Sequence, residues 1–259
     1  MTDLIASDAR ASVTWVGHST MLLDLDGFRV LTDPLLTARV VHLRRRRPLP
    51  ASEIGDVDLV LLSHAHMDHL HLPSLRLVRP SATVVTPVGA GPLLRRAGFA
   101  DVREVREGDS VAVGPVTVVT VPAAHRHGRG PHSRVEASPV GFVVESPAGR
   151  HYFAGDTDLF AGMADLGELD VALLPIWGWG PSVGVGHLDP PRAVDAVELL
   201  RPRLVVPMHW GTYAPEDGRR RLPSWFHDPV ERFAALVEDA DEGAGLRVVE
   251  PGASVDVSR

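Results

Sequence analysis

Four potential metal ligands lie within six residues, directly after a short apolar segment. The apolar residues 59–62 lead into residues 64–69, which read HAHMDH. Imidazole and carboxylate groups together suit Zn²⁺, Mn²⁺ or Fe²⁺. In an extended chain His64, His66 and Asp68 would point to one side, because side chains alternate with a period of two. A turn near Asp68 would bring the last histidine in from another angle, so the segment predicts two adjacent metal sites.

Three later segments offer further ligands at points where a predicted strand ends. His125 and His127 follow one apolar strand, Asp156 follows a second, and His209 follows a third. Loops at strand ends commonly carry functional side chains, so these residues are the candidates that would complete the site. Gly155 permits close approach of the backbone, and the carboxylate after it is placed to bridge two ions.

The elements that must position these residues are short strands alternating with helices. Asp26-Gly27 between residues 20–25 and 28–32 is a strong hairpin signal. Further strands are predicted at 12–16, 58–63, 83–86, 102–105, 111–113, 116–121, 140–145, 151–154, 171–175 and 204–207. Helices are predicted at 73–78, 89–97, 158–166, 190–200 and 229–238, the fourth with Asp189 as N-cap. Residues 34–56 and 176–188 are expected to be long loops.

Composition limits the classes of protein that the chain can be. It has 259 residues and is 44% hydrophobic, which suits one globular domain over residues 1–259. Cysteine is absent, so any metal must be held by His, Asp or Glu. A net charge of −7 argues against nucleic acid as a partner. No apolar run is long enough for a membrane span, and the polar N-terminus does not resemble a signal peptide, so a cytoplasmic location is expected.

One local exception to the acidic balance is the run Arg44-Arg45-Arg46-Arg47. Charge runs are usually solvated, so a solvated loop is the simpler interpretation. The alternative is a surface that attracts anions.

The order of these motifs resembles the metallo-β-lactamase superfamily. The flanking motifs are similar to the branch that holds N-acyl-phosphatidylethanolamine phospholipase D and the ascorbate-6-phosphate lactonase. They are WVGHST at 15–20, LTDP at 31–34, GDT at 155–157, HLDP at 187–190 and HWGT at 209–212. The resemblance runs from about residue 12 to about residue 213.

The resemblance implies an α+β fold, an αββα four-layer sandwich with the metal ions at one edge between two mixed sheets. It implies two divalent ions, with Zn²⁺ expected first, Mn²⁺ or Fe²⁺ as alternatives, and a one-metal form also open. By position, His64, His66 and His125 would hold the first ion. Asp68, His69 and His209 would hold the second, with Asp156 between the two. The family pattern favours His125 over His127.

The chemistry expected is hydrolysis of an ester, lactone or phosphodiester by metal-activated water or hydroxide. Asp68 would orient the hydroxide and accept its proton. His187 would donate a proton or stabilise negative charge, unless it only precedes the helix cap. His18 and Asp33 would orient ligands or contact substrate.

Alternatives remain open at this point. A phospholipase D-like phosphodiesterase acting on lipids would use Trp177, Trp179 and Trp225 as apolar surface. A non-catalytic metal-binding regulatory protein would have lost ligands, which this chain has not. A nuclease or a di-iron redox enzyme of this superfamily would require an additional domain, for which this sequence offers no segment. The expected partner is a small molecule or a lipid, with no nucleic acid and no stable membrane span, and a homo-oligomer is possible.

Overall fold

The computed structural model describes residues 9–47, 49, 54–130, 133–216, 221–240 and 243–259, and two large sheets form its centre. Within these residues the first sheet has seven strands, in the order β17-β1-β2-β3-β6-β7-β8. Its strands are β1 (Ala11–Gly17), β2 (Thr20–Leu25), β3 (Phe28–Thr32), β6 (Leu59–Leu61), β7 (Thr83–Pro87), β8 (Val102–Val105) and β17 (Ser254–Asp256).

The second sheet also has seven strands in the described part of the chain, in the order β16-β14-β13-β12-β11-β10-β9. They are β9 (Ser110–Val113), β10 (Val116–Pro122), β11 (Val140–Ser146), β12 (Gly149–Phe153), β13 (Val171–Pro175), β14 (Leu204–Met208) and β16 (Gly245–Leu246).

Both sheets are mixed, and this decides where the loops meet. β3, β6, β7 and β8 run parallel in the first sheet, and β12, β13, β14 and β16 run parallel in the second. The remaining pairs are antiparallel, including the predicted hairpin of β2 and β3. Asp26 and Gly27 both have positive φ, 55° and 88°, as a two-residue type I′ turn requires. Because parallel strands end at one edge of a sheet, the loops after them gather there.

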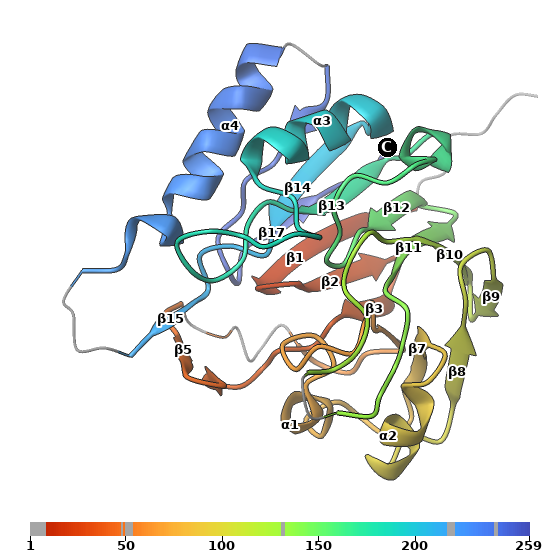
Figure 1. Ribbon diagram of the computed structural model, residues 1–259. Helices are drawn as coiled ribbons and strands as arrows, with labels where there is room; N and C mark the ends of the chain where they lie inside the picture. The colour runs from red at the N-terminus through yellow and green to blue at the C-terminus, as the bar shows by residue number, and fades with distance from the viewer. Residues whose placement is uncertain (1–8, 48, 50–53, 131–132, 217–220, 241–242) are drawn as a thin grey trace, which may run out of the picture.

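Helices cover the outer face of each sheet, which confirms the α+β four-layer sandwich (Figure 1). α1 (Leu72–Leu75) and α2 (Gly91–Arg96) lie on the first sheet, where Leu75 and Leu94 join an apolar cluster with Val60. α3 (Pro190–Leu200) and α4 (Asp228–Ala240) lie together on the second sheet. Asp189 caps α3 as predicted, since its side chain accepts from the backbone N–H of Arg192.

The loop expected at 34–56 contains two short strands instead. β4 (Arg39–Val40) and β5 (Leu43–Arg45) pair with β15 (Tyr213–Pro215) in a small third sheet. The expectation of a solvated arginine run is therefore wrong for part of it. Arg45 donates to the carbonyls of Val16 and Leu35. The Arg47 guanidinium lies 5.6 Å from the centre of the Trp210 ring and donates to the carbonyl of Gly211.

The helix predicted at 158–166 is also wrong. Only the 3₁₀ turn η1 (Met163–Leu166) forms there. The backbone N–H of Asp158 donates to the carbonyl of Ala124, which draws the start of the segment into an isolated β-bridge. Gly162, with φ 85°, then marks the point where the turn begins. A second 3₁₀ turn, η2 (Ser224–Phe226), precedes α4.

Within the described residues, no helix combines the length and apolarity that crossing a membrane would require.

Candidate metal centre

Three histidines from two loops converge at the edge where the parallel strands end. His64 and His66 follow β6, and His125 follows β10 of the other sheet. His66 Nδ1 lies 3.0 Å from His64 Nε2 and 3.1 Å from His125 Nε2. Two nitrogens bound to one tetrahedral zinc ion at its usual bond length would be about 3.3 Å apart. The spacing of the three nitrogens therefore fits one small cation.

A second group lies beside the first and is fully buried. The chain turns after His66, because the N–H groups of His69 and Leu70 both donate to the carbonyl of His66. This turn brings His69 Nε2 to 3.4 Å from Asp68 Oδ2. His209, the first residue after β14, places its Nε2 4.0 Å from the same oxygen. Sequence reasoning expected such a turn, and it divides the 64–69 segment between two ligand groups.

Asp156 lies between the two groups. Its Oδ2 is 3.1 Å from His69 Nε2, and its Oδ1 is 3.1 Å from His209 Nε2. Its Oδ2 also lies 4.0 Å from the Nε2 atoms of both His64 and His125. The carboxylate thus faces both ligand groups at once, which is the arrangement that a bridging ligand needs.

Gly155 makes this position of Asp156 possible. Its φ is 62°, and a Cβ atom there would lie 2.4 Å from the Cβ of Ser63. A larger residue would therefore push the two strand ends apart. The absence of a side chain lets the loop after β12 approach the loop after β6.

Protein acceptors fix the orientation of three of the imidazole rings. The Nδ1 atoms of His69, His125 and His209 each lie 2.7 Å from an oxygen that can only accept a hydrogen bond. These oxygens are Asp33 Oδ2, the carbonyl of Gly186 and the carbonyl of Trp177. In the neutral ring each Nδ1 therefore carries the proton, which leaves the Nε2 lone pair directed into the site. This is the form of histidine that binds a metal ion.

Ser63 orients His64 in the same way, and sequence reasoning missed it. Its hydroxyl lies 2.5 Å from Asp33 Oδ2 and 2.9 Å from His64 Nδ1. Because the carboxylate can only accept, the hydroxyl donates to Asp33 and accepts from His64. Asp33 thereby supports two rings, one directly and one through Ser63. The only signal in the sequence is that Ser63 immediately precedes the histidine cluster.

His18 contacts Asp68 directly, with 2.9 Å between His18 Nε2 and Asp68 Oδ2. Its backbone N–H donates to Thr212 Oγ1, and its carbonyl accepts from the N–H of His209. His18, Asp33 and His209 all have positive φ, 55°, 31° and 64°. Sparsely populated backbone conformations such as these concentrate at functional sites, where surrounding contacts hold them in place.

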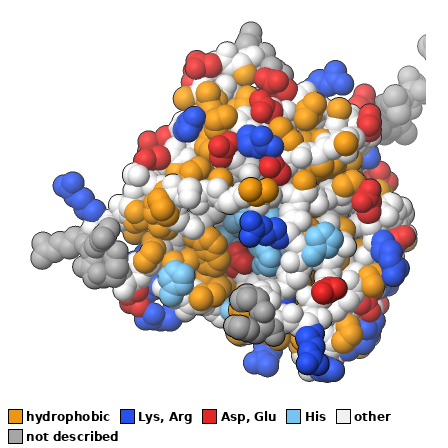
Figure 2. Space-filling view, in the orientation of Figure 1, with side chains coloured by type: hydrophobic (Ala, Val, Ile, Leu, Met, Phe, Trp, Pro, Cys, Tyr) orange, Lys and Arg blue, Asp and Glu red, His pale blue; other side chains and the backbone are white. Residues whose placement is uncertain are grey.

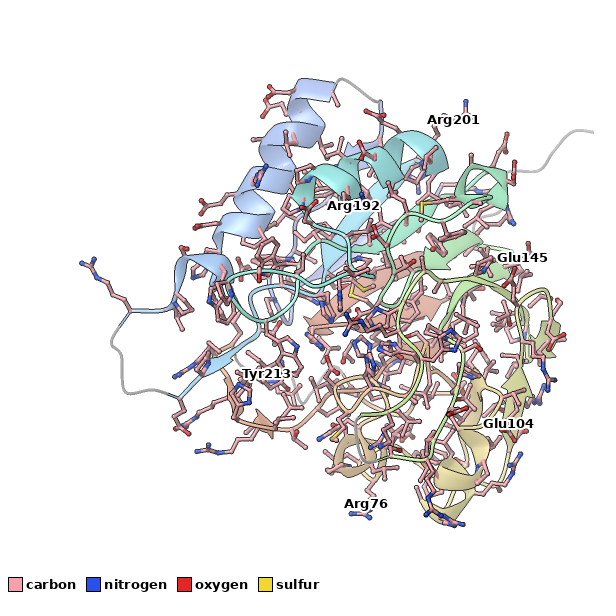
Figure 3. All side chains as sticks on the ribbon, in the orientation of Figure 1. Arg76, Glu104, Glu145, Arg192, Arg201 and Tyr213 are labelled. Carbon is pink, nitrogen blue, oxygen red and sulfur yellow. The ribbon has the colours of Figure 1, made fainter. Side chains whose placement is uncertain are left out.

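His187 lies at the open side of the cluster. Its Nε2 is 3.5 Å from Asp156 Oδ2, and its side chain is 24% exposed. Its ring packs edge-on against His125, with 4.6 Å between ring centres. His127, the alternative to His125, is exposed and lies 3.4 Å from Ser138 Oγ. The structure thus brings together all the expected ligand-type residues except His127, as the central cluster of ring nitrogens in Figure 3 shows.

The electrostatics of the cluster favour a bound cation. Burial lowers the pKa of His209 to about 3 and that of His66 to about 4, so both rings are neutral at pH 7. Burial raises the pKa of Asp156, but the facing His209 and His69 outweigh it and hold the pKa well below the usual range. Burial lowers the pKa of His69, but Asp156, Asp68 and Asp33 outweigh it and raise the pKa. The three carboxylates therefore favour positive charge at this point.

Three buried atoms of the cluster make no hydrogen bond to any residue that the structure describes. They are His69 Nε2, His209 Nε2 and Asp156 Oδ1. Buried polar atoms in proteins are rarely left without a partner, and an ion is one explanation. A set of imidazoles and carboxylates without thiolate suits Zn²⁺, Mn²⁺ or Fe²⁺. The residues present therefore fit one or two divalent ions.

Comparison with known proteins gives an independent view of the chain. A family model described as a β-lactamase superfamily domain matches residues 28–210, a range that contains the cluster apart from His18. An uncharacterized protein of Mycobacterium tuberculosis is 36% identical over 266 residues, which cover 96% of this chain and 69% of the relative. A UPF0173 metal-dependent hydrolase of Methanopyrus kandleri is 33% identical over 249 residues, which cover 94% of this chain and 99% of the relative.

Among solved structures, the chain is similar to Igni18, described as a novel metallo hydrolase from Ignicoccus hospitalis. The TM-score is 0.72 at 29% sequence identity, and the match covers 95% of this chain and 98% of Igni18. The similarity therefore extends over nearly the whole of both proteins.

Proposed function

The chain belongs to the metallo-β-lactamase superfamily and is a metal-dependent hydrolase, and on that premise we propose that it cleaves an ester, lactone or phosphodiester bond. We further propose that two divalent ions assist the reaction, Zn²⁺ first, with Mn²⁺ or Fe²⁺ as alternatives. The relatives' names give the reaction class but not the bond. The choice of bond rests on the chemistry of the cluster.

One observation carries the proposal. Four imidazoles donate from Nδ1 to protein oxygens, so that their Nε2 lone pairs face one buried carboxylate, Asp156. A purely structural cluster would use those nitrogens in hydrogen bonds. Here two of them, and one oxygen of the carboxylate, have no such bond to the described residues.

The assignment of ligands follows the two groups. His64, His66 and His125 would hold one ion, and Asp68, His69 and His209 the other, with Asp156 between them. A divalent ion, when bound, lowers the pKa of a coordinated water to about 7 and so supplies a nucleophile at neutral pH.

We assign proton transfer to two residues. His18 Nε2 lies 2.9 Å from Asp68 Oδ2 and orients the carboxylate. Burial raises the pKa of Asp68, but His69 and His18 outweigh it and hold the pKa well below the usual range. We assign Asp68 to orienting the nucleophile and accepting its proton. His187 is half-buried at the open side, where it can donate a proton to the leaving group or stabilise negative charge on it.

Metal analysis combined with a substrate screen tests the proposal. Purified protein should contain divalent metal, and a chelator should abolish hydrolysis of a generic ester, lactone or phosphodiester until Zn²⁺ or Mn²⁺ is restored. Replacing His187 with Ala should lower turnover while leaving the metal content unchanged. Protein with full metal content that is inert toward all three bond types would contradict the proposal and favour a non-catalytic regulatory role. Activity confined to lipid phosphodiesters would favour the phospholipase D-like alternative.

A further inference from the structure

An apolar groove opens beside the metal centre, between segments that are far apart in the sequence. Its volume is about 510 Å³, within the usual range for small-molecule sites. Among the described residues it is lined by the β4–β5 turn, by the loop after β13, by β15 and by η2. The lining side chains that the argument uses are Val41, Trp179, Pro181, Pro215 and Trp225. Figure 2 shows hydrophobic side chains gathered over β5 and β15, next to the central histidines.

One residue, Trp179, both lines the groove and contacts the metal centre. The Trp179 ring lies 5.2 Å from the ring of His18, which contacts Asp68. The same loop supplies the Trp177 carbonyl that accepts from His209 Nδ1. Trp179 also packs against Tyr213, which is labelled in Figure 3, with 6.4 Å between ring centres. The groove and the cluster are therefore neighbours that share the Trp179 side chain.

The edge of the groove carries an apolar residue in a conformation that does not suit it. Val40 pairs with Leu43, so Val41 and His42 form a two-residue hairpin turn. Val41 has φ 48° and is 74% exposed. A β-branched residue is an outlier in the left-handed region, and turns that need a positive φ usually have Gly or Asn there. Neither backbone geometry nor burial accounts for a valine at this position.

The charges around the groove do not favour an anionic surface as its occupant. Arg44 and Arg39 both pair with Glu216, and Arg46 donates to the Pro215 carbonyl. Arg47 pairs with Glu250. These four arginines are therefore engaged by the protein itself, and the described side chains that line the groove are mainly uncharged.

We propose that this groove binds an uncharged aliphatic or aromatic arm of the substrate whose scissile group lies at the histidine cluster. The proposal rests on the proposed function, because it names the substrate class of the same site. The volume of about 510 Å³ suits one small molecule.

Binding of unreactive alcohols tests the groove separately from catalysis. Affinities of butan-1-ol, hexan-1-ol and octan-1-ol for the metal-loaded protein are measured by ligand-observed NMR titration. Each added methylene should tighten binding about twofold to fourfold until the groove is filled. Trp225→Ala should remove most of this increase in affinity with chain length, and Val41→Asn should remove part of it. Leu77→Asn removes an equally apolar but distant side chain, 66% exposed, and should change nothing.

A hydrolysis series gives the second readout. For 4-nitrophenyl acetate, butyrate and octanoate, kcat/KM should rise with chain length in the wild type and in Leu77→Asn, and stay nearly flat in Trp225→Ala. Equal affinities for butan-1-ol and octan-1-ol overturn the proposal. So does an octanol affinity that both variants leave intact, or a dimer that Trp225→Ala dissociates and octanol does not. Graded alcohol binding without hydrolysis of any ester would overturn the ester function and leave the groove assignment standing.

Discussion

The histidine cluster and the apolar groove lie side by side, but different forces hold them in place. Buried hydrogen bonds fix the cluster, as the Asp33 contacts to Ser63 and His69 illustrate. The groove is held by packing of half-exposed side chains and by a strained turn at Val41. The loop after β13 serves both regions, with backbone carbonyls toward the cluster and the Trp179 side chain toward the groove. Changes in the cluster should therefore abolish the reaction, whereas changes in the groove should alter only its selectivity.

Within the cluster, the two ligand groups also differ in their exposure to solvent. His18, Asp68, His69 and His209 are all buried residues, whereas His66 of the other group is only partly buried. The site formed by His64, His66 and His125 should therefore release its metal ion more easily than the other site, because His66 is open to solvent.

The largest effect is expected at the residue that both ligand groups share. Asp156→Asn removes the charge that faces His69, His209, His64 and His125. Metal content should fall at both sites, and kcat/KM by about 10³-fold or more, roughly 4 kcal/mol of transition-state stabilisation. Elemental analysis and steady-state kinetics measure the two effects. Asp158→Asn is the matched control, because Asp158 pairs with Arg192 on the surface side. Full metal content in Asp156→Asn would show that the carboxylate does not bridge.

The next largest effect is expected on metal affinity, at two residues that support the ligand histidines, and it distinguishes the two ligand groups. Ser63→Ala removes the acceptor for His64 Nδ1 only, whereas Asp33→Asn disturbs both His64 and His69. Loss of such a supporting contact typically weakens metal affinity about 10- to 100-fold. Competition with a chelator should therefore show one weakened site in Ser63→Ala and two in Asp33→Asn. Identical metal-binding curves for the two variants would mean that Asp33 does not link the two groups.

The cluster was predictable from the sequence because its chemistry is local. Four ligand types within residues 64–69 and single ligands at strand ends point to one sheet edge. Ser63 was not predictable in the same way. Its role depends on the contact with Asp33, which follows the neighbouring strand β3 and is brought close only by the pairing of β3 with β6.

The sequence named Trp179 and Trp225 as candidate apolar surface, but it did not predict that they line one groove with Val41. These residues meet only because β5 pairs with β15, and strands of three residues carry no useful periodicity.

The sandwich fold was correctly predicted from the resemblance of the motifs. The hairpin at Asp26-Gly27 and the cap at Asp189 were correctly predicted from strong local signals. The helix at 158–166 failed because its first residue forms a tertiary β-bridge with Ala124.

A buried histidine outside the cluster separates the effect of burial from the effect of metal. Burial lowers the pKa of His151 from 6.5 to about 4. As the pH falls below 6.5, His151 becomes protonated in the unfolded chain but stays neutral in the folded protein until about pH 4. The free energy of unfolding is therefore highest above pH 6.5 and decreases as the pH falls through this range. The loss amounts to about 3 kcal/mol at most. Urea unfolding of the metal-free protein at pH 7.5 and pH 4.5 measures it.

His151→Leu should remove the share of that pH dependence that His151 contributes, and replacing the exposed His127 should not change it. The remainder comes from the cluster, where burial lowers the pKa values of His209 and His66 in the same direction. The same pH dependence in His151→Leu and in the wild type would assign the acid sensitivity to the cluster instead.

The smallest effect is expected at Val41, on the edge of the groove. Here the substitution should raise the stability of the protein, whereas the other changes lower a property. Asn tolerates positive φ far better than valine does, so Val41→Asn should relieve backbone strain. Little packing is lost, because the valine is 74% exposed. Stability should rise by about 1 kcal/mol, and the melting temperature by about 2 °C. A thermal melt beside Leu77→Asn, which relieves no positive φ, isolates the backbone contribution. If Val41→Asn melts below the wild type, the turn is not strained. If it melts above the wild type and also loses affinity for octan-1-ol, the valine lowers stability at the same position where it contributes to binding.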